Sequence, residues 1–106
     1  MSSTGPVEPA AATLPREDRA AAIEARLREA LAPLELVVTD DSHKHRGHAG
    51  AADGRSHFSV RVVSAAFVGL RPLARHRAVY EALGTLMTTD IHALAIEALA
   101  PGEPGA

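Results

Sequence analysis

The chain has 106 residues, the size of one domain, with 46% hydrophobic residues and a formal net charge of −2. These values allow one modest core, and they exclude a chain that is wholly a polyanion-binding tail. No run approaches the roughly 18 to 20 apolar residues of a membrane span, so we expect no membrane partner. The absence of cysteine excludes disulfides, thiolate nucleophiles and cysteine metal sites built by this chain alone, and it fits a reducing, cytoplasmic setting.

Both ends of the chain are predicted to be tails. Residues 1–14 are mostly small residues and prolines, with too little apolar surface to offset the entropy of ordering them, so we expect a disordered N-terminal tail. Residues 101–106 predict a second short tail for the same reason. The domain is then expected to span residues 15–100.

The first predicted element is a helix over residues 16–31, which Pro33 ends. Its expected core face consists of Ile23, Leu27, Ala30 and Leu31. Residues 34–39 and 57–64 are β-branched and partly alternating, which predicts two strands. In the second strand, Phe58, Val60 and Val62 share one face, and His57, Ser59 and Arg61 share the other.

Pro72 is well placed in the first turn of a second helix. The apolar stripe of this helix is expected to consist of His76, Val79, Tyr80, Leu83, Leu86 and Met87. Residues 91–99 predict a third strand, because the segment is short and follows a helix. The element order predicts an α+β domain, αββαβ, in which the last two strands form a right-handed parallel crossover and the helices cover one sheet face.

A long connection separates the first two strands. Residues 40–56 number 17, whereas hairpin loops usually have about 2 to 5 residues, so this segment is either functional or mobile. It contains His43, His45 and His48, and His57 follows at the start of the next strand. Imidazole is a common metal ligand, so the run is a candidate metal site. The alternative is a solvated loop that binds zinc or nickel only weakly.

His92 lies in an otherwise apolar run at the start of the third strand. A polar ring there needs a partner or must face a cleft, because an unpaired buried polar group costs roughly 1 to 3 kcal/mol. Taken alone, the residue is either a core histidine bonded to a backbone carbonyl or a functional group.

Positive charge is concentrated in residues 54–80, which contain five arginines and no acidic residue. Three of them, Arg71, Arg75 and Arg77, lie at the start of the second helix, where they suit contacts with phosphate groups. The alternatives are a solvated helix face or a face for an acidic protein.

Motifs of catalysis are absent from the sequence. There is no G-x-S-x-G elbow, no G-x-G-x-x-G and no phosphate-binding loop with Lys followed by Ser or Thr. Paired carboxylates occur only as sequence neighbours, at Glu17-Asp18 and Asp40-Asp41. We therefore expect no enzyme.

Three blocks in order carry a family resemblance: SHFSVRVVS at 56–64, RHRAVY at 75–80 and IHALA at 91–95. With these blocks the chain resembles the BolA family over nearly all of the predicted domain. The resemblance implies a fold like the class II KH module, with a three-stranded mixed sheet and helices packed on one face. It also implies a non-enzymatic partner of monothiol glutaredoxins, with a bridging [2Fe-2S] cluster that glutaredoxin and glutathione hold on one side.

The resemblance makes His92 an expected iron ligand and His48 the second, in a loop where the family's second ligand varies. His43, His45 and His57 are reserve candidates. Histidines replace cysteines on one iron of Rieske centres, so the ligand type suits such a cluster. The free protein is expected to be a monomer or a weak homodimer.

The family is also associated with transcriptional regulation in stress response and cell morphology. The turn FVGLRP has no G-x-x-G loop of the kind that clamps a nucleic-acid backbone in true KH modules. The leading prediction is therefore an adaptor for iron–sulfur trafficking and iron homeostasis. One alternative is a DNA-binding regulator that uses Arg71, Arg75 and Arg77, and another is a partner that docks glutaredoxin without iron.

Overall fold

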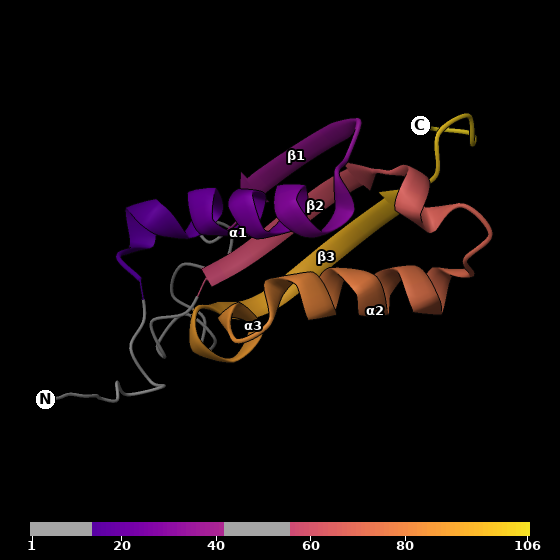
Figure 1. The fold of residues 1–106 in the computed structure, drawn as a ribbon. Coiled ribbons are helices and arrows are strands. Elements are labelled where there is room, and N and C mark those ends of the chain that lie inside the picture. Colours follow the sequence, from indigo (N-terminus) through magenta and orange to yellow (C-terminus); the bar gives the residue numbers. More distant parts are fainter. Residues whose placement is uncertain (1–13, 42–55) are drawn as a thin grey trace, which may run out of the picture.

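The computed structural model describes residues 14–41 and 56–106. The described chain forms, in order, α1 (Arg16–Leu31), β1 (Glu35–Asp40), β2 (Ser56–Val63), the short 3-10 helix η3 (Ala65–Phe67), α2 (Pro72–Leu83), α3 (Leu86–Thr89) and β3 (Ile91–Leu99) (Figure 1). Residues 1–13 of the predicted N-terminal tail and residues 42–55 of the predicted loop lie outside the described residues. Within the described ranges, every helix is too short or too polar to cross a bilayer.

The sheet has the strand order β1-β2-β3. β1 pairs with β2 antiparallel, from Glu35 opposite Val63 onward, and β2 pairs with β3 parallel. The predicted parallel pairing of the last two strands and the mixed sheet are therefore confirmed. The register of the parallel pair shifts once, because Ser56 lies opposite Ile91 whereas His57 lies opposite Ala93. β3 thus has one extra residue at His92, which is the geometry of a β-bulge.

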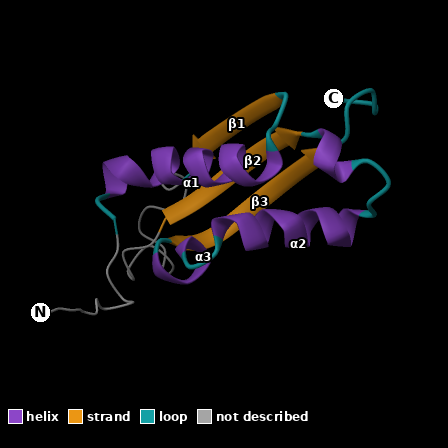
Figure 2. Ribbon diagram, viewed as in Figure 1, coloured by secondary structure: helices purple, strands orange, loops and turns teal. Residues whose placement is uncertain are grey.

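α1 and α2 lie on the same face of the sheet, and the core fills the space between them and the strands (Figure 2). The largest buried hydrophobic side chains come from α1, β2, η3, α2 and β3. They are Ile23, Leu27, Phe58, Val62, Phe67, Val79, Leu83 and Ile91. The predicted α+β architecture with helices on one sheet face is confirmed.

The buried face of α1 differs from the prediction at two positions. Ile23, Leu27 and Leu31 are buried as expected, but Ala30 is exposed. Arg19 continues the same four-residue spacing at the start of the helix and is itself buried. The hydrophobic pattern misses Arg19 because a charged residue is read as a surface residue, although a buried partner can compensate its charge.

The predicted single stripe from His76 to Met87 is wrong as one helix. α2 ends at Leu83, because Gly84 has φ +56° and ψ −129°, a backbone conformation that residues with a Cβ rarely adopt. Leu86 and Met87 still contact the core, but they do so from the separate helix α3. Tyr80 is 43% exposed and lies outside the buried stripe.

Each of the two predicted tails contains a residue that lies against the domain. Leu14, placed in the N-terminal tail by the sequence, packs on the core and donates its backbone N–H to Asp90 Oδ2 at 2.7 Å. In residues 101–106, the Glu103 carboxylate accepts two hydrogen bonds of 2.7 Å from Arg75 and one of 3.0 Å from the Ala100 N–H. The C-terminal residues are thus docked, because an arginine of α2 supplies the partner that their own composition lacks.

Candidate functional site

His57 and His92 lie side by side at the starts of the two parallel strands. Their ring centroids are 4.9 Å apart, with the ring planes tilted by 56°. Phe58 and Ile91, the sequence neighbours of the two histidines, point into the core, so strand alternation places both imidazoles on the sheet face away from the helices. His57 is 8% exposed, whereas His92 is exposed.

The register shift lies at the same place as the ring contact. Ser56 lies opposite Ile91 and His57 lies opposite Ala93, so His92 is the extra residue of β3, and its ring lies against that of His57. Reasoning from the sequence singled out both histidines separately, without their contact. The bulge depends on strand pairing, so no local motif in the sequence would have revealed it.

The loop candidates His43, His45 and His48 lie outside the described residues. In residues 14–41 and 56–106 there is no group of three or more His, Cys, Asp or Glu side chains placed to hold a metal ion. The described part of the chain therefore supplies a pair of imidazoles rather than a complete metal site.

A buried polar network includes Ser56 and Asp90, which come just before His57 and His92 in the chain. The Arg19 guanidinium pairs with the Asp90 carboxylate at 3.3 Å between Nε and Oδ2, with the two side chains 7% and 2% exposed. Arg19 Nη1 donates to Ser56 Oγ at 2.8 Å, and Arg19 Nε donates to the Leu14 carbonyl at 3.1 Å. Buried charges require this kind of pairing and hydrogen bonding.

Asp41 connects the end of β1 to the same region. Its backbone N–H donates to the His57 carbonyl at 2.7 Å, and its carboxylate accepts a hydrogen bond from the Ser59 hydroxyl. The backbone of His57 is therefore held from both sides, by β1 and by β3.

The predicted phosphate-contacting arginines do not form one set. Arg75 is 12% exposed, pairs with Glu103 at 2.7 Å and donates to the carbonyls of Leu70 and Ala98. The hydrogen bonds with Glu103 raise the pKa of Arg75, and the same contact lowers the pKa of Glu103 to about 2. Arg75 thus holds the C-terminal turn against α2, a contact that the sequence does not show, and its predicted role in phosphate binding stays a prediction.

Arg71 and Arg77 are exposed, at the start and on the outer side of α2. Within the described ranges neither makes an ion pair. His76, on the same helix, is half-buried. Two of the three predicted arginines therefore remain available at the surface.

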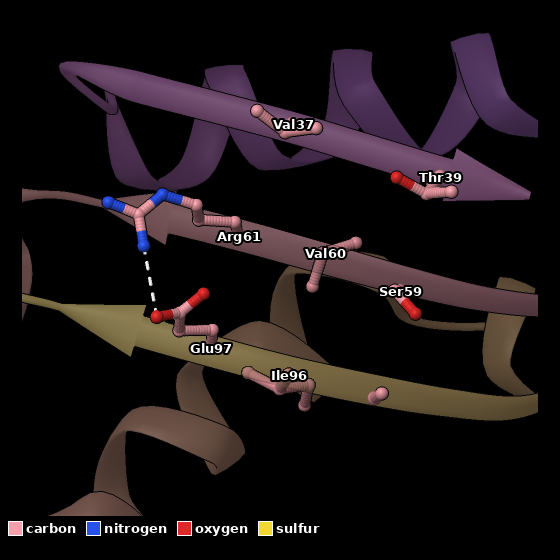
Figure 3. Close-up of a pocket in the computed structure, with 8 residues that line it drawn as sticks. Val37, Thr39, Ser59, Val60, Arg61, Ile96 and Glu97 are labelled. Atoms are coloured by element: carbon pink, nitrogen blue, oxygen red, sulfur yellow. Dashed lines mark ion pairs between the residues drawn. The ribbon is translucent and has the colours of Figure 1, made fainter. Parts of the chain in front are cut away.

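The sheet face away from the helices carries a shallow depression of about 220 Å³ (Figure 3). Arg61 crosses it and pairs with Glu97 of β3 at 2.9 Å and with Glu35 of β1 at 3.0 Å. The hydrogen bonds with Glu35 and then Glu97 raise the pKa of Arg61. The ion pairs of Arg61 join β2 to both neighbouring strands. The two carboxylates compensate the charge of Arg61, so the depression is not a cationic surface.

Comparison with known proteins identifies the family. The family model described as BolA-like protein matches residues 27–103. An uncharacterized protein of Sinorhizobium is 48% identical over 84 residues, covering 77% of this chain and 90% of that protein. BolA-like protein 1 of mouse is 46% identical over 83 residues, covering 78% of this chain and 58% of that protein. The match therefore spans little more than half of the mouse protein.

Two further comparisons bear on the fold and on function. The solved BolA domain of SufE1 from Arabidopsis thaliana has a TM-score of 0.71 at 38% identity, covering 84% of this chain and 96% of that one. The DNA-binding transcriptional regulator BolA of Escherichia coli is 45% identical over 74 residues, covering 70% of this chain and 68% of that protein. From the matched family model, the sequence identities and the shared fold, the chain belongs to the BolA-like protein family.

Proposed function

We propose that this protein is a non-enzymatic adaptor that binds a monothiol glutaredoxin and shares a [2Fe-2S] cluster with it, for iron–sulfur trafficking and iron homeostasis. The observation that carries the proposal is the exposed imidazole of His92 at the start of β3, which lies against the ring of His57. His92 is the ligand from this chain, and His48 is the second. The glutaredoxin cysteine and glutathione supply the thiolates.

The donor chemistry of the chain supports this division. The chain has no cysteine and six histidines, so it offers imidazoles but no thiolate to a cluster. Histidine nitrogens serve on one iron of Rieske clusters, whereas the other iron keeps thiolates. A chain with imidazoles alone is therefore suited to complete a cluster that a thiol-bearing partner already holds.

In the proposal, His57 orients the ring of His92, and the His92 nitrogen binds iron. His57 packs against the His92 ring and limits its freedom, so that less entropy is lost when the ring binds iron. When bound, a cluster would supply an iron to which the imidazole nitrogen of His92 could bind. Protonation of that nitrogen competes with iron, so acid favours release of the cluster from this chain.

The test is anaerobic reconstitution of a monothiol glutaredoxin with glutathione, alone and with this protein, followed by visible absorption and circular dichroism. The wild-type chain should change the glutaredoxin spectrum and co-elute with it as a one-to-one complex. His92→Ala should lose the new spectrum, and His76→Ala, a histidine replacement on α2, should keep it. An unchanged spectrum with the wild-type chain, or a retained one with His92→Ala, would refute the ligand assignment.

A second candidate function is DNA binding. It is favoured by the Escherichia coli relative, whose name describes a DNA-binding transcriptional regulator, and by the exposed Arg71 and Arg77. Phosphate contacts release counterions, so the logarithm of the binding constant falls with the logarithm of the salt concentration by about 0.9 per contact.

Replacing both exposed arginines by glutamine should weaken DNA binding and reduce that salt slope by about 2. Fluorescence anisotropy with duplex DNA at stepped salt concentrations measures both quantities. His92→Ala is the control, and it should leave the slope unchanged. A slope that is the same in the double arginine variant and in the wild type would remove this surface as the DNA site.

A further inference from the structure

The ion pair of Arg19 and Asp90 is buried at the end of the sheet where β2 and β3 begin. The N-terminal end of α1, the short helix α3 and the starts of both strands meet at this end of the molecule (Figure 1). The Asp90 carboxylate also accepts hydrogen bonds from the Leu14 N–H at 2.7 Å and from the Thr89 hydroxyl at 2.5 Å. Asp90 is thus held by three separate donors.

The network contacts both strands immediately before the two histidines. Ser56 precedes His57, its hydroxyl accepts from Arg19 at 2.8 Å, and its backbone N–H donates to the Asp90 carbonyl at 2.9 Å. Asp90 itself is two residues before His92. One guanidinium therefore ties the residue before His57 to the turn before His92, at the point where the register shifts.

We propose that Arg19 and Asp90 are positioning residues that hold the strand starts so that the imidazoles of His57 and His92 lie side by side. The consequence for a cluster rests on the proposed function, but the placement of the two rings does not. A well-packed pair of apolar residues often replaces a buried ion pair without loss of stability. A variant that keeps its stability but loses the contact between the two rings would show that the ion pair positions the rings, rather than only stabilising the fold.

The central variant is the double replacement Arg19→Met with Asp90→Asn in the full chain. It removes both charges together, so neither is left buried alone, and the amide oxygen at position 90 still accepts from the Leu14 N–H. The matched control is Leu31→Ala, which removes core packing at the opposite end of α1. Urea unfolding of each variant shows how much stability each change removes. Ser56→Ala is a milder third variant that deletes only one acceptor of Arg19.

The readout is histidine ring NMR of the protein without any metal. The centroid separation of 4.9 Å predicts a nuclear Overhauser effect between the two rings of the wild-type protein. The double variant and Ser56→Ala should lose or weaken it and shift both sets of ring resonances, whereas Leu31→Ala should retain it. Affinity for cluster-loaded glutaredoxin should fall about 10-fold in the double variant, the lower end of the effect of removing outer-shell partners of metal ligands.

Unchanged ring contacts in the double variant, or an equal loss in the Leu31→Ala control, would overturn the proposal. If the wild-type chain leaves the glutaredoxin spectrum unchanged while the ring contacts respond as expected, the adaptor function fails and the positioning role stands. If the wild type binds the cluster normally and the nuclear Overhauser effect between the rings is unchanged in the double variant, the adaptor function stands and the positioning role fails.

Discussion

At the scale of single residues, the charged pair Arg19 and Asp90 is the feature least expected from the sequence. A buried charge is costly by itself, and the pair is tolerated because the two charges face each other and are further hydrogen-bonded. Removing one partner leaves the other charge buried and uncompensated. Removing one member of the pair is therefore expected to cost more stability than the intact pair contributes.

The Arg19→Met variant alone should lower the free energy of unfolding by about 3–5 kcal/mol, the usual effect of breaking a buried pair. Urea unfolding monitored by far-UV circular dichroism measures this value. The matched control is Arg28→Met on the same helix, where an exposed pair with Glu24 is worth about 0.3–0.5 kcal/mol. Equal effects of the two replacements would show that the Arg19 pair is not buried as described.

At the scale of elements, a glycine decides where the helical region divides. Gly84 follows Leu83 with φ +56°, accepts no Cβ without strain and directs the chain into α3. The hydrophobic spacing continues across this glycine, and that continuity is why periodicity alone predicts one helix. The residue that ends α2 is thus identified by backbone conformation rather than by pattern.

Gly84→Ala should lower the free energy of unfolding by about 1–3 kcal/mol, because the backbone conformation of this residue is essentially restricted to glycine. Part of the cost comes from Arg26 Nη1, which lies 3.3 Å from the position of the added Cβ. Thermal unfolding compares this variant with Thr85→Ala, an exposed neighbour that should change stability by less than about 0.5 kcal/mol. A Gly84→Ala protein as stable as the wild type would contradict the assigned conformation.

The docked C-terminal turn makes stability depend on acid pH. The hydrogen bonds from Arg75, and then that from the Ala100 N–H, lower the pKa of Glu103 from 4.5 to about 2. The contribution of Glu103 is fully present above pH 4.5 and is lost as the pH falls toward 2, where the folded protein also binds the proton.

The difference in unfolding free energy between the wild type and Glu103→Gln should therefore be constant above pH 4.5 and should shrink between pH 4.5 and about 2. Urea unfolding at stepped pH values gives this difference directly. A difference that persists unchanged at pH 2 would mean that Glu103 does not make the ion pair.

At the scale of the whole molecule, local patterns predicted the element order and the mixed sheet, because strand alternation, the Pro72 helix start and the crossover rule are local or nearly local. The bounds of α1 and β3 agree with the prediction, and those of β1 and β2 differ by one residue at each end. Contacts between distant residues were the part that local patterns missed. Arg75 with Glu103, Arg19 with Asp90 and the His57–His92 ring contact all join segments far apart in sequence.

The candidate site shows the same division. His92 was singled out as a polar ring in an apolar run, and that signal is local. Its contact with His57 depends on the pairing of two strands, and the buried network at Ser56 and Asp90 depends on the packing of α1. The set of chemically suitable residues was thus accessible from the sequence, whereas their arrangement required the fold.

The central claim is that an imidazole of this chain binds iron in a cluster shared with glutaredoxin. The most direct test is pulsed electron paramagnetic resonance of the reduced mixed cluster, with ¹⁵N-histidine in this chain only and an unlabelled glutaredoxin. A strong ¹⁵N coupling is predicted for the wild type and for His76→Ala, with its loss in His92→Ala. A cluster that forms in the presence of the labelled chain but shows no ¹⁵N coupling would contradict the account.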